Sequence, residues 1–381
     1  MANRPDEGTT VRVQMPAPAM ASCEVVIRTG ALRELGMLAA GSVPAAQYAV
    51  LAPRTVASLY GGLVMDSLEQ AGLSARLLQF EDGEEHKTRQ TWARLTDQLL
   101  AYGYGRDSCI IALGGGVAGD VAGFVAATYM RGLPVIQVPT SLLAMVDASV
   151  GGKTGVDTEA GKNLVGAFHA PSLVVADPGV LRTLPGTELR AGLAEAVKHG
   201  AILDVEYFGW INEHAVALQS ADSALLEHLV RRSVELKAGI VEEDPFEAGR
   251  RAILNFGHTV GHALERQSGY RLLHGYAVAL GMIAEATAGE QVGVTEKGTT
   301  TDLRAVLRRC GLPVTADAGD VDGLLSAMRL DKKARGGMPR LALLQRVGSC
   351  AAAGDHEWTH PVPDSVLAAS ISTLATGAQA V

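Results

Sequence analysis

A strand-like run that ends in three consecutive glycines is the feature that most constrains the fold of this chain. Ser108–Leu113 has the composition of a buried strand and runs directly into Gly114-Gly115-Gly116. Val117–Tyr129 then has the pattern of a helix, and Leu133–Val138 has that of a second strand. Strand, helix and strand in this order predict a parallel sheet with helices on its faces.

The glycine turn is also a candidate binding site. Backbone amides at the start of a helix bind phosphate, and glycine lets the phosphate approach the chain closely. A tight strand–helix turn without a ligand would need the same glycines, but a position between a strand and a helix is the context that supports binding. Gly114–Asp120 therefore favours a dinucleotide or phosphate site.

Strand and helix patterns alternate in the first half of the chain, whereas the second half is mainly helical. Further strands are predicted at Cys23–Arg28 and Ala49–Ala52, and further helices at Ala31–Ala40, Val56–Ala71 and Thr88–Tyr102. The elements predicted in the second half are helices at Thr187–Ile202, Val205–Glu213, Ser223–Glu242, Gly249–Gln267, Gly275–Val292 and Thr300–Arg309, a strand at Leu341–Leu344 and a terminal helix at Ser365–Leu374.

A chain of 381 residues is long for a single core, which predicts two domains. We expect a loose N-terminal extension over residues 1–21, an α/β domain over 22–185, a helical domain over 186–353 and a C-terminal tail over 354–381. A cleft between two such domains is a common place for an active site.

Composition excludes several classes of partner. The net charge of −8, without a basic run, argues against nucleic acid, which requires a cationic surface. No apolar run reaches the ~18–20 residues of a membrane span, and the first residues lack the hydrophobic segment of a signal peptide. Cys23, Cys109, Cys310 and Cys350 have no CxxC spacing, which predicts reduced thiols in a cytoplasmic protein.

Histidines are concentrated in one segment, since three of the ten fall within seventeen residues. His258 and His262 are four apart and share one face of a helix, and His274 follows. Neutral imidazole suits zinc and similar divalent metals. Thr259 stands where the zinc protease motif needs a glutamate, so that motif is absent. Spacing alone leaves a metal site and a set of structural histidines equally open.

Glu195 is a candidate third ligand. It lies three residues before Lys198 on a predicted helix, and apolar residues flank both. A surface ion pair would have the same spacing, but the flanking residues predict a partly buried position, where a carboxylate needs a partner or a metal. Glu195, His258 and His274 together form an oxygen and nitrogen donor set like that of catalytic zinc sites with an open position.

Several cations lie around a second glycine-rich segment, Pro139–Gly155. Arg131 precedes this segment, Lys153 lies within it and Lys162 follows it, with Asp147 between them. A solvated charged surface would also contain lysines, but it would not need the glycines. Cations framed by glycine suggest a site for phosphate or carboxylate.

Short motifs along the chain are shared with a known family. They occur in order between about Cys23 and Ser349, and they are Asp82-Gly83-Glu84-Glu85-His86-Lys87, Gly114–Asp120, Ala127-Thr128-Tyr129-Met130-Arg131-Gly132, Pro139–Gly155, Gly161-Lys162-Asn163, Gly192–Lys198, Asn255–His262, His274-Gly275 and Asp331-Lys332-Lys333. In these motifs the chain resembles the 3-dehydroquinate synthases of the sugar-phosphate cyclase superfamily.

The resemblance implies a homodimeric carbon–oxygen lyase of the shikimate pathway of aromatic amino acid biosynthesis. Its fold would be a Rossmann-like α/β domain with a parallel sheet that binds NAD+, followed by an all-helical C-terminal metal-binding domain. The metal would be Zn²⁺ or, as a second choice, Co²⁺. The substrate would be 3-deoxy-D-arabino-heptulosonate 7-phosphate. Such enzymes oxidise it transiently with NAD+, eliminate phosphate, reduce the ketone again and form 3-dehydroquinate by an intramolecular aldol reaction.

The resemblance also implies roles for individual residues. Glu195, His258 and His274 match metal ligands, and Arg131 matches a residue that reaches across the dimer interface. The other residues that match the substrate site are Asp147, Lys153, Asn163, Lys198, Lys237, Arg251, Asn255, His262 and one of Lys332 and Lys333. The residues that match NAD-contacting segments are Asp82, Gly83, Glu84, Lys87, Gly115, Gly116, Val117, Asp120, Thr140, Ser141, Lys153, Lys162, Leu181 and Thr183.

Four residues depart from the family pattern: Pro53 replaces a frequent Asn, Ser141 a Thr, Met145 a Gln and Tyr276 a Glu. Met145 and Tyr276 leave open a cyclase of secondary metabolism, such as a 2-epi-5-epi-valiolone, 2-deoxy-scyllo-inosose or aminodehydroquinate synthase. The retained cations favour the dehydroquinate reaction. They also argue against a metal-dependent polyol dehydrogenase, which would release NADH, and a non-enzymatic scaffold would not need this set of residues.

Overall fold

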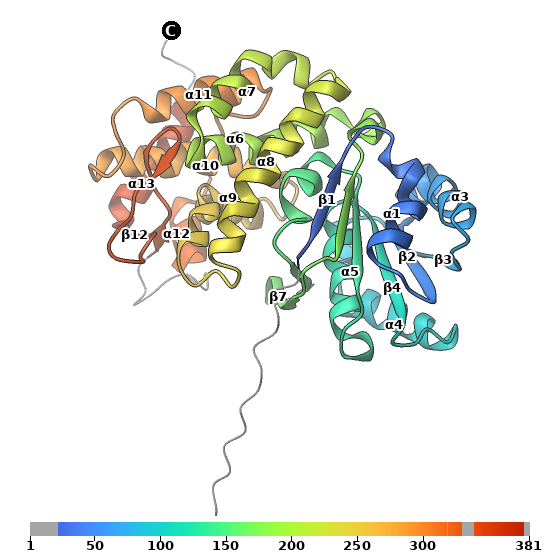
Figure 1. Cartoon of the computed structure of the whole chain (residues 1–381). Coiled ribbons are helices and arrows are strands. Elements are labelled where there is room, and N and C mark those ends of the chain that lie inside the picture. Colours follow the sequence, from blue (N-terminus) through green and yellow to red (C-terminus); the bar gives the residue numbers. More distant parts are fainter. Residues whose placement is uncertain (1–21, 318, 330–338, 377–381) are drawn as a thin grey trace, which may run out of the picture.

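The computed structural model describes residues 22–317, 319–329 and 339–376. An α/β part built on one sheet lies beside a helical part (Figure 1). All six strands of the sheet run parallel, in the order β1-β8-β5-β4-β2-β3. Their bounds are β1 (Glu24–Ile27), β2 (Gln47–Pro53), β3 (Ala75–Phe80), β4 (Ser108–Gly114), β5 (Val135–Pro139) and β8 (Leu173–Ala176). The predicted parallel sheet is confirmed.

Helices cover both faces of this sheet because its central strands are apolar on both sides. Val50 of β2 packs in one core with α1 and α3, whereas the next residue, Leu51, packs in a second core with α4 and α5. This burial of both faces is typical of parallel sheets. The helical segments of this part are η1 (Ala31–Glu34), α1 (Leu35–Ser42), α2 (Arg54–Val56), η2 (Ala57–Gly61), α3 (Gly62–Gln70), η3 (Glu84–His86), α4 (Arg89–Ala101), α5 (Gly116–Thr128), η4 (Tyr129–Arg131), η5 (Ala144–Ala148) and η6 (Pro178–Thr183).

The strand order changes direction at β2, which has β3 on one side and β4 on the other. The carboxyl ends of β2 and β4 are Pro53 and Gly114, and a Cβ added to Gly114 would lie 3.1 Å from Cδ of Pro53. Ligands of open α/β sheets bind outside the carboxyl ends of the strands at such a switch point. The glycine turn therefore lies where this topology places a ligand.

Four strands of the α/β part were not predicted from the sequence. β3 pairs with β2 at one edge of the sheet, and β8 pairs with β1 and β5. β6 (Lys153–Thr158) and β7 (Gly161–Phe168) pair only with each other, as an antiparallel hairpin in which Thr154 faces Ala167. The glycine and lysine segment that the sequence suggested as a loop is thus the base of a hairpin.

The second half of the chain is helical, with two short two-stranded ladders, β10 with β11 and β12 with β9. The elements are α6 (Gly186–Leu203), α7 (Val205–Leu218), α8 (Ser223–Glu243), η7 (Arg250–Asn255), α9 (His258–Gln267), α10 (His274–Gln291), α11 (Thr299–Arg309), α12 (Val321–Arg329), β9 (Arg340–Leu341), β10 (Leu344–Arg346), β11 (Ser349–Cys350), β12 (His360–Pro361) and α13 (Asp364–Thr376). Within the described ranges, no helix is long and apolar enough to cross a membrane.

The prediction of one helix over Gly249–Gln267 was wrong. A 3-10 turn, η7, ends at Asn255, and α9 begins afresh at His258. Gly257 between them has a φ of 81°, a left-handed conformation that breaks a helix. A Cβ on Gly257 would also lie 2.6 Å from Cγ of Met282, so α10 packs directly against this break.

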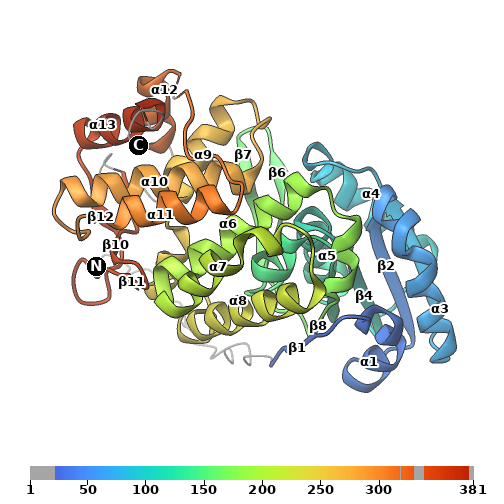
Figure 2. The same ribbon diagram turned by 90° about the horizontal axis from the view of Figure 1, so that it is seen from above.

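One apolar core runs from the sheet into the helical part. It joins Val50 and Ile111 of the sheet with Leu193 of α6 and Val278 of α10. The predicted terminal helix is present as α13, and its fully buried Leu367 belongs to the same core. The sheet and the helices are therefore held in one arrangement, with the helical part beside the α/β part (Figure 2).

Candidate functional site

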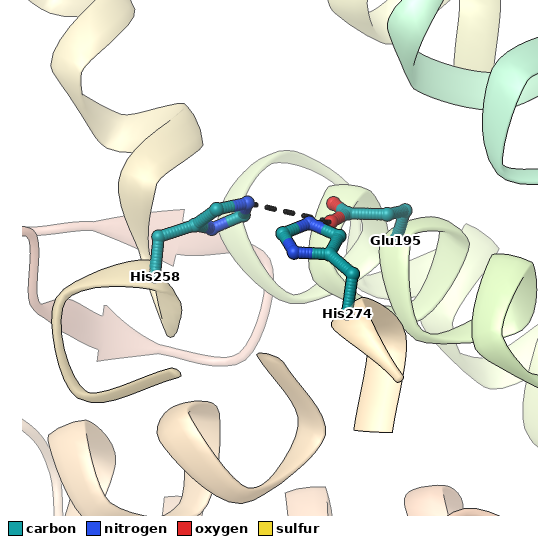
Figure 3. A group of neighbouring side chains, drawn as sticks. All are labelled: Glu195, His258 and His274. Atoms are coloured by element: carbon teal, nitrogen blue, oxygen red, sulfur yellow. Dashed lines mark ion pairs between the residues drawn. The ribbon is translucent and has the colours of Figure 1, made fainter. Parts of the chain in front are cut away.

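Glu195, His258 and His274 converge from three different helices (Figure 3). Glu195 lies in the middle of α6, while His258 and His274 are the first residues of α9 and α10. Oε1 of Glu195 lies 3.4 Å from Nε2 of His258 and 3.2 Å from Nε2 of His274. One donor atom from each residue lies within 4.8 Å of the others. The structure thus brings together the three residues that the sequence suggested as ligands.

Glu195 is fully buried and His258 nearly so, whereas the side chain of His274 is 32% exposed, and the charges of the three depend on one another. Burial disfavours the ionised form of Glu195, but Lys198 and His258 outweigh it and hold the pKa of that carboxyl well below its usual range. Burial lowers the pKa of His258. Burial also opposes protonation of His274, but the nearby carboxylates of Glu195 and Glu265 raise its pKa to about 10.

The donor set fits a divalent metal. Zinc–ligand distances of about 2.0–2.1 Å place tetrahedral ligand atoms roughly 3.3 Å apart, close to the separations found here. Neither oxygen of Glu195 accepts a hydrogen bond of acceptable geometry from the described residues, although Nζ of Lys198 lies 2.5 Å from Oε2. A fully buried carboxylate without such partners has free acceptor capacity for a cation.

The start of α9 is held by a carboxylate from α10. Glu285, fully buried, accepts hydrogen bonds from the backbone amides of Gly257 at 2.7 Å and Val260 at 3.0 Å. Gly257 is the N-cap residue and has no side chain with which to cap the helix. Glu285 therefore supplies the cap from a neighbouring helix and fixes the position from which His258 projects.

Asp147 organises a second polar group next to the first. Its Oδ1 lies 2.8 Å from Nζ of Lys237, 3.9 Å from Nζ of Lys198 and 3.4 Å from Nε2 of His199. Burial favours a neutral Asp147, but Lys237 and Lys198 outweigh it and hold its pKa well below the usual range. Burial lowers the pKa of Lys237. Asp147 is therefore a charged anchor for two buried ammonium groups.

A third group surrounds Glu247. Its carboxylate forms an ion pair with Lys153 and accepts a 2.5 Å hydrogen bond from Nδ2 of Asn255. Arg251 is buried nearby and donates to the carbonyl oxygens of Pro245 at 2.5 Å and Gly151 at 2.9 Å. These contacts bring the base of the β6–β7 hairpin together with the η7 segment.

The glycine turn lies at the start of α5. Gly115 is the N-cap residue and makes no side-chain hydrogen bond, so the first amides of α5 have no side-chain cap. A Cβ on Gly115 would lie 3.2 Å from Oγ of Ser141, and the amide of Thr140 donates to the carbonyl oxygen of Gly114 at 2.9 Å. Gly116, Val117 and Thr140–Ser141 thus lie around one helix N-terminus, as predicted for a phosphate site.

Other residues suggested for the cofactor lie near the carboxyl ends of β3 and β4. Nζ of Lys87 lies 2.5 Å from Oδ2 of Asp120 and donates to Oδ1 of Asn163 at 2.5 Å. Asp82, just after β3, accepts hydrogen bonds from the amide and hydroxyl of Thr55, and Gly83 follows it with a φ of 107°. A hydrogen bond therefore joins Asn163, which was predicted to contact the substrate, to Lys87, which was predicted to contact the cofactor.

Lys162 and Glu265 lie between the suggested cofactor residues and the group of Glu195, His258 and His274. Lys162 lies 3.2 Å from Oε1 of Glu84 and 3.4 Å from Oε1 of Glu265. The second oxygen of Glu265 accepts from Nδ1 of His274 at 3.1 Å. Burial would raise the pKa of Glu265, but the hydrogen bond to His274 outweighs it and lowers this pKa to about 2. His262 is exposed beside His258 and His274, with ring centroids 5.3 and 5.9 Å away.

The remaining suggested residues are more scattered. Thr183 shares a 2.6 Å hydrogen bond with the hydroxyl of Tyr60, whereas the side chain of Leu181 is buried in the core. Arg131 is exposed in η4 with a φ of 69°. Lys332 and Lys333 lie outside the described residues.

Three polar residues of the site were missed by the sequence analysis. Glu265 follows His258 by seven residues on one helix, so helical spacing could have identified it. His199 follows Glu195 by four, and the same argument applies. Glu247 lies in an irregular segment with a φ of 58°, where no periodic signal exists.

The structure shows the contacts of two residues that depart from the family pattern, Met145 and Tyr276. The side chain of Met145 is only 1% exposed and belongs to the core shared by the sheet and the helices. The hydroxyl of Tyr276 accepts a hydrogen bond from Nε of Arg190 at 3.2 Å. Both side chains therefore have partners in the protein itself.

Comparison with known proteins identifies the family. Models of the N-terminal and C-terminal parts of 3-dehydroquinate synthase match residues 77–191 and 192–334. A 3-dehydroquinate synthase of Symbiobacterium thermophilum is 45% identical over 334 residues, which cover 87% of this chain and 93% of that protein. One of Xanthomonas axonopodis pv. citri is 47% identical over 317 residues, or 81% and 86% of the two chains.

A solved structure extends the comparison to the fold. The 2-epi-5-epi-valiolone synthase of Streptomyces hygroscopicus subsp. jinggangensis, with NAD+ and Zn²⁺ bound, superimposes with a TM-score of 0.85 at 27% identity. The match covers 96% of this chain and 99% of that chain. In sequence, in both of its parts and in fold, the chain belongs to the 3-dehydroquinate synthase family.

Proposed function

We propose that this protein converts 3-deoxy-D-arabino-heptulosonate 7-phosphate to 3-dehydroquinate and inorganic phosphate, as a carbon–oxygen lyase of the shikimate pathway. The observation that carries the proposal is the group of Glu195, His258 and His274, which lies next to buried Lys198 and Lys237 in a member of this family. A metal site beside buried cations suits a substrate that must be oxidised at a hydroxyl while its anionic groups are held.

We assign the metal to Glu195, His258 and His274, and NAD+ to the switch point of the sheet. The cyclase relative described above was solved with NAD+ and Zn²⁺, and a 2-deoxy-scyllo-inosose synthase with 26% identity to this chain was solved with NAD+ and Co²⁺. When bound, the metal would supply Lewis acidity toward the substrate hydroxyl that NAD+ would oxidise. Oxidation to a ketone acidifies the neighbouring C–H, which makes elimination of phosphate possible.

The residues of the chain itself bind and orient the substrate. Lys153 and Arg251 carry positive charge at the base of the β6–β7 hairpin, where they suit phosphate or carboxylate oxygens. Oδ1 of Asp147 lies 2.8 Å from Nζ of Lys237 and 3.9 Å from Nζ of Lys198, so this carboxylate orients the two cations. Asn163 and Asn255 add hydrogen-bond donors, and Lys332 or Lys333 would complete the set.

A comparison of two substrates tests this function. Purified protein with NAD+ and Zn²⁺ or Co²⁺ should release phosphate from the heptulosonate phosphate with no net NADH, and it should leave sedoheptulose 7-phosphate unchanged. Turnover of sedoheptulose 7-phosphate alone would instead identify a valiolone-type cyclase. Steady accumulation of NADH would identify a polyol dehydrogenase.

A homodimer is the assembly that we propose for the active enzyme. Phe168 and Phe246 are 49% and 64% exposed and meet edge to face at 5.5 Å between ring centroids. Leu164 projects from the same side of β7 and is 39% exposed, so apolar side chains gather on this hairpin. The exposed Arg131 would reach the active site of the partner subunit.

Mixing two inactive variants tests both parts of this assembly. Arg131→Ala and His258→Ala chains are each expected to be inactive alone. In a mixed dimer, the Arg131→Ala chain keeps His258, and its partner, the His258→Ala chain, supplies an intact Arg131 to that site. Activity should therefore partly return after subunit exchange. No recovery, with exchange confirmed by native mass spectrometry, would place Arg131 in its own subunit's site or outside any site.

The boundary between residues 185 and 186 stays a prediction, as do the cytoplasmic location and the limits of the terminal segments. All four cysteines are free, as the sequence predicted.

A further inference from the structure

Glu265 is a buried carboxylate with no role in binding a substrate or a metal as assigned so far. It lies two helical turns after His258 on α9, and its side chain is only 3% exposed. One oxygen accepts from Nδ1 of His274 at 3.1 Å, and the other lies 3.4 Å from Nζ of Lys162. A buried carboxylate is costly unless it is paired, so these two contacts define its position.

The contact with His274 decides which nitrogen of that imidazole is free. When Nδ1 carries the proton that it donates to Glu265, the lone pair of the neutral ring lies on Nε2. Nε2 is the atom directed at Glu195, 3.2 Å from its Oε1. A carboxylate behind a ligand histidine in this manner fixes the ring orientation and raises its strength as a ligand.

The contact with Lys162 extends across the two parts of the molecule. Lys162 belongs to β7, and Figure 2 shows the β6–β7 hairpin beside α9. Its Nζ also lies 3.2 Å from Oε1 of Glu84, which begins η3, and 4.6 Å from the centre of the Tyr270 ring. A continuous series of ionic contacts therefore runs from Glu84 through Lys162 and Glu265 to His274.

We infer that Glu265 is a positioning residue that sets His274 for the metal and, through Lys162, couples metal binding to NAD+ binding. The inference rests on the proposed function, which places the metal at His274, and on the match of Glu84 and Lys162 to the NAD-contacting segments of the family. Movement of Lys162 on binding of NAD+ would change the support that Glu265 gives to His274. Because coupling between binding sites is reciprocal, the metal must change the affinity for NAD+ by the same factor.

Metal affinity tests the first part. Titration of Co²⁺ into the metal-free protein, followed by its absorption spectrum, should show about 10- to 100-fold weaker binding for Glu265→Gln than for the unaltered protein. Glu296→Gln is the matched control, because it removes the same charge at an exposed position in the helical part. Equal thermal unfolding of the two metal-free variants would show that the loss is not a loss of fold.

The same titration separates the inference from the function on which it rests. Absence of Co²⁺ binding by the unaltered protein would overturn the metal assignment itself. Normal binding by the unaltered protein and by Glu265→Gln would overturn only the positioning role. Two ions per chain would also overturn it, because His262, Glu265 and His274 would then form a second metal group.

Coupling tests the second part. The dissociation constant for NAD+ is measured with and without Co²⁺. In the unaltered protein the two values should differ by about 5-fold or more. In Lys162→Met and in Glu265→Gln the ratio of the two values should move toward one. A uniform loss of NAD+ affinity in Lys162→Met with an unchanged ratio, or a ratio of one in the unaltered protein, would overturn the coupling.

Discussion

At the scale of single residues, Gly114 and Gly116 occupy the same turn but have different surroundings. Gly114 has a φ of 154°, and a Cβ there would lie 2.5 Å from Cβ of Ala118. Gly116 has no such strain, and the nearest atom to an added Cβ is 3.8 Å away. The first glycine is thus required by the fold, whereas the second leaves space in front of the α5 amides.

Alanine at these two positions should have different effects. Gly114→Ala should lower the free energy of unfolding by about 1–3 kcal/mol because of its strained backbone and its steric clash. Gly116→Ala should leave stability nearly unchanged and weaken NAD+ binding at least several-fold, because its methyl group occupies the space that a phosphate would enter. Urea unfolding and NAD+ titration measure the two quantities. Unchanged NAD+ affinity in a folded Gly116→Ala variant would contradict the cofactor assignment at this turn.

At the scale of secondary structure elements, helix starts carry much of the site. α9 begins with His258 and has a glycine at its N-cap, so its first amides depend on Glu285 of α10. α10 in turn begins with His274. One carboxylate therefore joins the two helices that begin with the candidate ligands His258 and His274.

Glu285→Gln tests this cap. A glutamine offers one acceptor oxygen and places a donor against the second amide, so one buried N–H loses its partner, at a cost of about 1–3 kcal/mol of unfolding free energy. Co²⁺ affinity should fall as well, because His258 is the first residue of α9. Denaturant unfolding and metal titration measure both effects, with Glu296→Gln as the control. A variant with unaltered stability would show that Glu285 does not serve as the cap.

Asp204 gives the start of α7 a pH-dependent stability. Its Oδ1 accepts from the amide of Tyr207 at 3.0 Å, and its Oδ2 accepts from Nε of Arg232 at 2.9 Å. Burial would raise its pKa, but these hydrogen bonds outweigh it, and the pKa in the folded protein is lowered. The contribution to stability is therefore complete above the unfolded pKa of about 3.9 and is lost as the pH falls through the folded pKa.

Two substitutions of Asp204 separate the cap from the charge. Asp204→Ala should lower the free energy of unfolding at pH 7 by about 1 kcal/mol or more, because it removes the cap and the ion pair. Asp204→Asn keeps a capping oxygen and should lose less. The difference between Asp204→Asn and the unaltered protein should shrink below about pH 4, where the carboxylate is protonated. A difference that does not change between pH 7 and pH 3 would contradict the role of the charge.

At the scale of the whole molecule, the metal group draws on three helices of one continuous core. A ligand that binds only the folded state stabilises it by mass action. Zn²⁺ or Co²⁺ at a concentration 100 times its dissociation constant should raise the free energy of unfolding by about 2.7 kcal/mol. A chelator should reverse the effect.

His258→Ala should remove that stabilisation together with activity, while the metal-free variant stays folded. Calorimetric or denaturant unfolding with and without metal, together with metal content after dialysis, measures the outcome. Normal metal content in His258→Ala would show that this histidine is not a ligand.

Local patterns in the sequence were sufficient to predict much of the fold. The apolar run before Gly114, the glycines after it and the helix over Val117–Tyr129 predicted the core of the parallel sheet correctly, because each pattern is set by neighbours in the chain. The helix predicted over Gly249–Gln267 failed because Gly257 adopts a left-handed conformation against Met282 of another helix. Strands β3 and β8 were missed since their pairing partners lie far away in the chain.

The sequence by itself determined the donor types and the faces on which they lie. Histidines four residues apart on a helix, and a glutamate among apolar residues, limited the ligands to a few candidates. Only the tertiary structure placed Nε2 of His274 3.2 Å from Oε1 of Glu195, left His262 exposed beside it, and brought Glu247 of an irregular segment to Asn255. Periodicity follows from backbone geometry within a few residues, whereas contacts between helices depend on how their side chains pack in the shared core.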